Sequence, residues 1–122
     1  IDKNRAWIIH KKLNALLMVK AAKYFIGRHN FNAFRSINCQ SKSPIKTIDY
    51  INVLKKNDKI IINIKAKSFL HSQVRIIVGT LVYVGKEKIK PIKIKSIIKK
   101  AERKNSGPTA PPEGLYLKSV KY

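Results

Sequence analysis

The sequence has little of what secreted, membrane-spanning, metal-binding and nucleotide-hydrolysing proteins depend on. Cys39 is the only cysteine among 122 residues, so no intrachain disulfide can form, and a reducing, cytoplasmic location is expected. No apolar run approaches the roughly 20 residues that span a bilayer. The five glycines form neither a phosphate-binding loop nor a dinucleotide fingerprint. The histidines show no metal-ligand spacing with one another or with Cys39, so no zinc site is expected.

Acidic residues are also scarce. The chain has 6 Asp plus Glu against 27 Lys plus Arg, for a formal net charge of +21. This charge favours a polyanionic partner, with nucleic acid ahead of an anionic membrane surface. An AT-rich coding sequence would explain the abundance of lysine, but it should enrich glutamate as well. None of the carboxylates lies in a pattern that would bury or activate it, so we expect any catalytic carboxylate to lie outside this chain.

The length and a 44% hydrophobic content fit one compact domain. Periodicity predicts, in chain order, a strand at 6–10, a helix at 13–26 stopped by Gly27, strands at 47–54 and 59–67 around a turn at 55–58, a helix from about 70 to 85, a helix opened by Pro91, and a strand at 115–122. Residues 28–46 are predicted to be irregular and 105–114 to form a loop. This order predicts an α+β fold, a ferredoxin-like (split βαβ) antiparallel sheet backed by helices, with one extra helix before the last strand. Because the chain starts at Ile1, we interpret it as lacking an upstream segment.

Apolar spacing predicts which faces are buried. The predicted buried positions are Leu13, Leu17, Ala21 and Tyr24 in the first helix, Ile60, Ile62 and Ile64 in one strand, Leu70, Val74, Ile77, Leu81 and Val84 in the second helix, and Ile94, Ile97, Ile98 and Ala101 in the third. The opposite side of the third helix is rich in lysine and also carries Arg103. We interpret that side as a solvated surface.

Arg75 stands in the middle of the otherwise apolar second helix. Ser72 and Gly79 share its face, and their small side chains leave room around the guanidinium. A guanidinium in such surroundings requires a carboxylate partner. The residues alone leave open whether that ion pair would be catalytic or would only fix an interface.

Bases and aromatic rings are mixed between residues 28 and 36. Phe31 and Phe34 could stack on a nucleic-acid strand, but the interpretation that they cap the core is slightly favoured. The nearby bases are the better candidates for phosphate contacts that do not read sequence. These RNA-binding candidates are Arg28, Arg35, Lys42 and Lys46.

Four segments, taken in order, resemble the C-terminal half of the tRNA pseudouridine synthase A family. They are Phe31-Asn32-Ala33-Phe34-Arg35, Cys39-Gln40-Ser41-Lys42-Ser43-Pro44, Phe69-Leu70-His71 leading to Val74-Arg75 and Ile77-Val78-Gly79-Thr80, and Ser106-Gly107-Pro108-Thr109-Ala110-Pro111-Pro112 with Gly114-Leu115-Tyr116-Leu117. The resemblance covers essentially the whole chain. It departs from the family at Ser72-Gln73, where His-Met is common.

The resemblance implies that residues 1–122 are the C-terminal domain of a two-domain isomerase. That enzyme converts uridine to pseudouridine in the anticodon stem-loop of tRNA, at tRNA positions 38 to 40, without metal or cofactor. Arg75 would pair with a catalytic aspartate of the N-terminal domain, and Leu115 would form part of the apolar wall around the flipped base. The family's aspartate lies in an Arg-Thr-Asp tripeptide that is absent here, so this chain alone is expected to be inactive. The implied partners are tRNA, the missing N-terminal domain and a second copy in a homodimer.

The rival hypothesis is a non-catalytic, basic RNA-binding module of ferredoxin-like fold. Against it, the segment 59–67 carries no aromatic ring and so lacks the base-stacking signature of RNA-recognition domains. A weaker alternative is an interaction domain whose charge serves only solubility, which would make its tRNA affinity nearly independent of salt.

Overall fold

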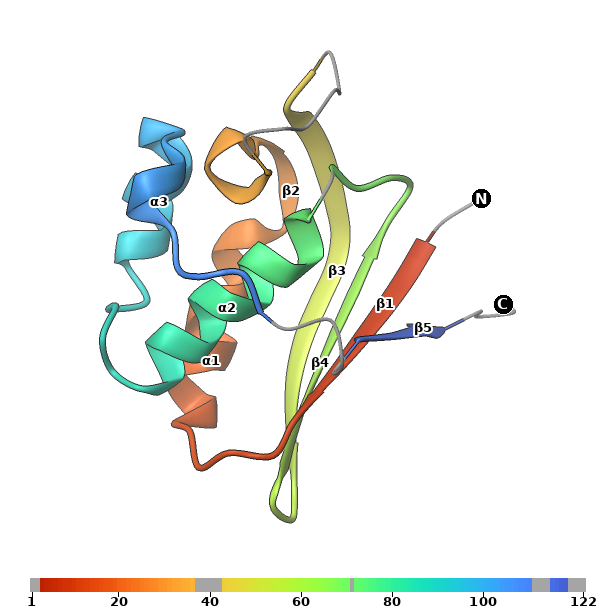
Figure 1. Ribbon diagram of the computed structural model, residues 1–122, viewed down its shortest axis with the longest axis vertical. Coiled ribbons are helices and arrows are strands. Elements are labelled where there is room, and N and C mark those ends of the chain that lie inside the picture. The colour runs from red at the N-terminus through yellow and green to blue at the C-terminus, as the bar shows by residue number, and fades with distance from the viewer. Residues whose placement is uncertain (1–2, 37–42, 71, 111–114, 119–122) are drawn as a thin grey trace.

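The computed structural model describes residues 3–36, 43–70, 72–110 and the backbone of 115–118 (Figure 1). The elements in chain order are β1 (Lys3–Ile9), α1 (Ala15–Ala22), the 3-10 helix η1 (Lys23–Phe25), β2 (Gly27–Asn30), the 3-10 helix η2 (Asn32–Phe34), β3 (Ile45–Lys56), β4 (Lys59–Ala66), α2 (Gln73–Gly85), α3 (Lys93–Lys100), the 3-10 helix η3 (Arg103–Asn105) and β5 (Leu115–Lys118). Within this part of the chain, no helix is long and apolar enough to cross a membrane.

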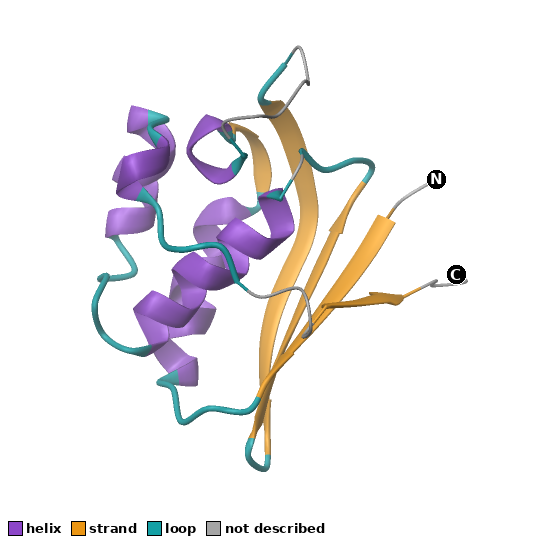
Figure 2. Cartoon of the chain, viewed as in Figure 1, coloured by secondary structure: helices purple, strands orange, loops and turns teal. Residues whose placement is uncertain are grey.

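The strands form one antiparallel sheet in the order β2-β3-β4-β1-β5. The helices lie together on one face of this sheet (Figures 1 and 2). The order β3-β4-β1-β5, with α1 after the first strand and α2 after β4, is the split βαβ arrangement. The predicted ferredoxin-like α+β fold is therefore confirmed, including the extra helix α3 before the last strand.

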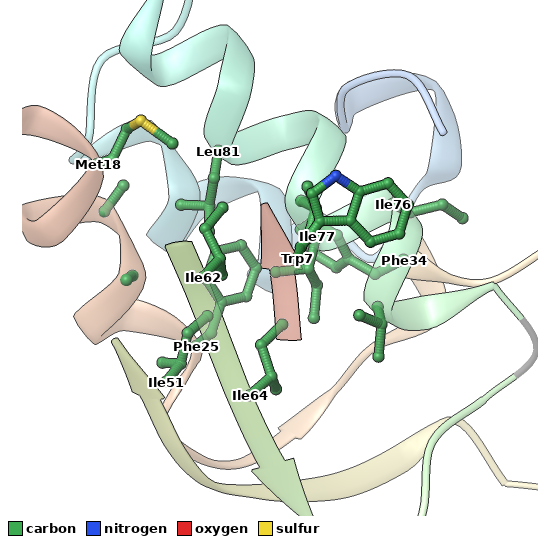
Figure 3. Packing of buried hydrophobic residues seen from close by; sticks show 14 of the residues in the cluster. Trp7, Met18, Phe25, Phe34, Ile51, Ile62, Ile64, Ile76, Ile77 and Leu81 are labelled. Carbon is green, nitrogen blue, oxygen red and sulfur yellow. The ribbon is translucent and has the colours of Figure 1, made fainter. Parts of the chain in front are cut away.

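The core lies between the sheet and α2, which is the most deeply buried helix. Every residue of the predicted α2 stripe is buried, and so are the three isoleucines of β4, where buried positions alternate with less buried ones. Figure 3 shows Ile62 and Ile64 of β4 together with Ile77 and Leu81 of α2 in this core. In α3, Ile94 and Ile97 are buried and the lysines of its opposite side are exposed, as the sequence predicts, whereas Ile98 and Ala101 of the predicted stripe are only partly buried.

The first helix is shorter than predicted and buries a different stripe. The Asn14 side chain accepts a hydrogen bond from the Leu17 amide and caps α1, so the helix begins at Ala15. The buried residues of α1 and η1 are Met18, Ala21, Ala22 and Phe25. Of the predicted face, Ala21 is buried, whereas Leu13, Leu17 and Tyr24 are only partly buried and pack against the edge of the core. Most positions of this segment are apolar, so spacing alone does not select the most buried stripe.

Residues 28–46 were predicted to be irregular, and for the described residues 28–36 and 43–46 this prediction was wrong. They contain most of β2, all of η2 and the first residues of β3. The strand β2 pairs with the start of β3, which begins at Ile45. The four residues of β2 are glycine, basic and polar residues, without the alternating apolar residues that predict a strand. Their extended conformation therefore depends on pairing with β3. Phe31 and Phe34 are fully buried, and the Phe34 ring meets the Phe25 ring edge-on at 5.1 Å between centroids. The preferred interpretation of these rings as core residues is confirmed.

Candidate functional site

Arg75 lies in the first turn of α2, where its side chain is partly buried. Its Nε donates a hydrogen bond of 2.8 Å to the carbonyl oxygen of Ala110. In return, the Ala110 amide donates a 2.9 Å bond to the carbonyl of Arg75. These two bonds fix the base of the guanidinium to the segment that leads to β5. We call this segment, residues 106–110, the strap.

The far end of the Arg75 guanidinium has no partner within the described residues. Its two terminal nitrogens form no hydrogen bond or ion pair there, and the ion pair found in this part of the structure joins Lys104 to Glu102 at 3.3 Å. A partly buried guanidinium with unused donors can accept a carboxylate from another domain in a bidentate pair.

The strap packs backbone to backbone against α2 (Figure 1). A Cβ atom added to Gly79 would lie 1.7 Å from the carbonyl oxygen of Pro108, and one added to Gly107 would lie 2.7 Å from the Cα of Thr80. The buried Thr80 hydroxyl accepts a 2.8 Å bond from the Gly107 amide and donates a 2.8 Å bond to the Ile76 carbonyl. Gly79 is therefore required by the strap, in addition to leaving room beside Arg75.

The structure brings together two of the four predicted RNA-binding residues. Arg28 and Lys46 line a hollow of about 420 Å³ beside β2 and β3, together with Lys67 and Ser68. The Lys46 ammonium donates to the Ser68 hydroxyl at 3.2 Å. The remaining lining residues are Ser43, Ile45, Thr47 and Asp49. This cluster of three cations suits a phosphate group.

The other predicted site residues stand apart from this hollow. Arg35 follows η2, is partly buried, and does not line the hollow. Lys42 falls outside the described residues. The backbone of Leu115 begins β5 and pairs with Trp7 of β1, and the role of its side chain stays a prediction.

Two residues of the site region escaped the sequence analysis. Arg103 was predicted to lie on a solvated face, but its guanidinium donates to three groups of the strap. Gln73 is fully buried, and its Oε1 accepts from the Leu70 amide at 2.8 Å, which stabilises the turn that precedes Arg75. Its Nε2 has no hydrogen-bond partner among the described residues. Within those residues no group of three metal-ligating side chains is found.

Comparison with known proteins provides independent information on the whole chain. The model of a family described as tRNA pseudouridine synthase matches residues 21–122. The chain is 53% identical over 122 residues to the tRNA pseudouridine synthase A of Ehrlichia chaffeensis, 52% identical to that of Ehrlichia ruminantium strain Welgevonden, and 46% identical to that of Parvibaculum lavamentivorans. Each match covers 100% of this chain and 50% of the relative. The chain thus spans about half the length of the curated relatives it matches.

Proposed function

The chain belongs to the tRNA pseudouridine synthase family, and we propose that it is the C-terminal domain of a two-domain enzyme that converts uridine to pseudouridine in tRNA. The observation that carries this proposal is Arg75, fixed at its Nε by Ala110 while its terminal nitrogens remain without a partner in the described structure. Such a group fits the partner of a catalytic aspartate supplied by the other domain.

The proposed role of Arg75 follows from the chemistry of the reaction. In the isomerisation the ribose C1′ exchanges its bond to N1 of the base for a bond to C5. C5 loses its proton and N1 gains one, so the composition is unchanged. The base must leave its stack to be reached, and the pocket that receives it excludes water. Desolvation disfavours the ionised form of a carboxylate in such a pocket, and an adjacent guanidinium opposes this effect. Arg75 would keep the aspartate ionised and oriented, and Leu115 would supply part of the apolar wall.

Further proposals concern the substrate and the partners. The target uridines are those of the anticodon stem-loop, at tRNA positions 38 to 40, and the full-length enzyme acts as a homodimer. The N-terminal domain, which carries the aspartate, is a required partner. None of the described carboxylates contacts Arg75, which fits a partner carboxylate supplied by the N-terminal domain.

The proposed function is tested by assaying tritium release from tRNA that carries uridine labelled at C5. We expect turnover by the full-length protein and none by residues 1–122 alone, because the chain lacks the proposed catalytic carboxylate. Adding the separately produced N-terminal half to this chain is expected to restore measurable turnover. Release by the isolated chain would contradict the division of the site between two domains, and no release by the full-length protein would contradict the function itself.

Removal of the two cations Arg28 and Lys46 is expected to weaken tRNA binding by the full-length enzyme. If each neutralises one phosphate, the Arg28→Gln/Lys46→Gln variant should make the log-log salt dependence of the affinity shallower by roughly 1.4 to 1.8. Binding is measured by titration at several salt concentrations. The control variant Lys55→Gln/Lys56→Gln removes the same charge from the end of β3, where both lysines are exposed.

The comparison of these two double variants separates a phosphate contact from bulk charge. A smaller change for the control would support a contact in the hollow. Equal changes for both variants would indicate that only the net charge matters, as expected for a domain whose lysines serve solubility.

A further inference from the structure

The strap is held by hydrogen bonds at its start as well as at its end. It follows η3 and crosses α2 (Figure 1). Along the strap, Gly107 is bonded to Thr80 and Ala110 is bonded to Arg75. The Ala110 carbonyl can hold the Nε of Arg75 only while the strap stays on α2, so the anchoring of the strap controls the position of the guanidinium.

Arg103, on η3, supplies most of the anchor at the start of the strap. One terminal nitrogen of its guanidinium donates to the Ser106 hydroxyl at 2.8 Å and to the Gly107 carbonyl at 2.9 Å. The other donates to the Thr109 hydroxyl at 3.2 Å. The Ser106 hydroxyl in turn donates to the carbonyl of Arg103 at 2.9 Å. One side chain thus bonds to three of the five strap residues.

The chemistry of this anchor requires arginine. The planar guanidinium presents several donors in fixed directions, so it can bond a carbonyl and two hydroxyls at the same time. A lysine ammonium carries three donors on one atom and cannot span the same acceptors. Residues 86–104 contain many lysines and a single arginine, Arg103. That arginine stands at the position where one side chain must donate several hydrogen bonds.

We propose that Arg103 is a positioning residue for the isomerisation: it holds the strap on α2 and thereby fixes the guanidinium of Arg75. This inference rests on the proposed function of Arg75. Arg103 itself contacts neither the base nor the aspartate in this scheme. Without the Arg103 side chain, the bonds of Gly107 and Ala110 to α2 can still form, but the three bonds from Arg103 to the strap are lost. The strap would then leave α2 more often, and Arg75 would lose its fixed orientation.

The full-length enzyme carrying Arg103→Ala is expected to show a single-turnover rate on tRNA that is lower by about 10- to 100-fold, because small displacements of a catalytic group cost rates of this order. The dissociation constant for tRNA should change by no more than roughly twofold, since Arg103 is engaged with the strap. Hydrogen exchange of the Gly107 and Ala110 amides should accelerate by about tenfold, while the amides of α1 keep their protection.

Three further variants make the test specific. Lys104→Ala removes the same charge from the same 3-10 helix, and Lys104 is 79% exposed and bonded to Glu102 only, so rate and exchange should match the wild type. Arg103→Lys should rescue part of the rate, because one or two of the three bonds can be re-formed. Thr109→Val keeps the arginine and removes one acceptor, so a smaller fall in the same direction is expected.

Several outcomes would overturn the proposal. Unchanged exchange at Gly107 and Ala110 in Arg103→Ala would show that Arg103 does not hold the strap. Faster exchange with an unchanged rate would show that the strap does not position Arg75. A weaker tRNA affinity with an unchanged rate would instead make Arg103 a phosphate contact. If the wild-type enzyme has no turnover, the proposed function fails, and the exchange measurement alone then decides whether Arg103 anchors the strap.

Discussion

Replacing Arg75 with alanine in the full-length enzyme is expected to lower kcat on tRNA by a factor of about 100 to 1000, the usual loss when one preorganised charged or hydrogen-bonding group is removed from an active site. The fold should survive the change. Alanine favours helix, and the Ala110 amide can still donate to the carbonyl of residue 75 because that bond involves only the backbone. The loss should therefore appear in turnover, with little change in tRNA affinity.

Two comparisons distinguish catalysis from a purely structural ion pair. Arg75→Lys keeps the positive charge but loses the paired donors of the guanidinium and the Nε bond to Ala110. Its kcat should therefore lie between those of the wild type and Arg75→Ala. The exposed Lys56→Ala serves as a control for loss of a cation elsewhere and should turn over normally. If Arg75→Ala retained near-normal kcat but melted at a lower temperature, the arginine would only fix the interface between the two domains, and the catalytic assignment would be wrong.

Burial was predicted most sharply where the chain alternates between apolar and polar residues. Strand β4 is the clearest case, because Ile60, Ile62 and Ile64 face the core while their neighbours are less buried. The most buried face of the first helix was not predicted, because its nearly continuous apolar residues favour no single face. Strand β2 was missed because its four residues owe their conformation to pairing with β3.

The site shows the same division between local and long-range information. Arg75 stood out in the sequence because a charge interrupts an apolar helix. Its bond to Ala110 joins residues 35 positions apart, and no local pattern contains that information. Arg103 was misread because an arginine on a lysine-rich face looks solvated until the strap that it binds is in place. Gly79 was read as room for the guanidinium, whereas the closest atom that a side chain there would meet is the Pro108 carbonyl oxygen.

The close contact at Gly79 leads to the largest expected effect on stability. In Gly79→Ala the new Cβ would lie 1.7 Å from a backbone oxygen of Pro108, whereas real Cβ atoms almost never approach closer than 3.0 Å, so either the strap or α2 must move. Overpacking of this kind is expected to lower the free energy of unfolding by about 3 kcal/mol. Denaturant unfolding of the chain measures this change.

Gly85→Ala, at the end of the same helix, is the matched control for Gly79→Ala. Its Cβ would lie 2.7 Å from the Met18 sulfur, on a flexible side chain that can shift, and 2.9 Å from the Leu13 Cβ, so residue 13 must also move slightly. These overlaps are smaller than the one at Gly79 and involve no backbone atom, and the higher helix propensity of alanine offsets part of the cost by up to about 1 kcal/mol, so a smaller loss of stability is expected. Equal stability of the two variants would contradict tight packing of the strap on α2. If Gly79→Ala also lowers kcat of the full-length enzyme while Gly85→Ala does not, the displaced strap has released Arg75, because Gly79 itself has no side chain to contribute to the reaction.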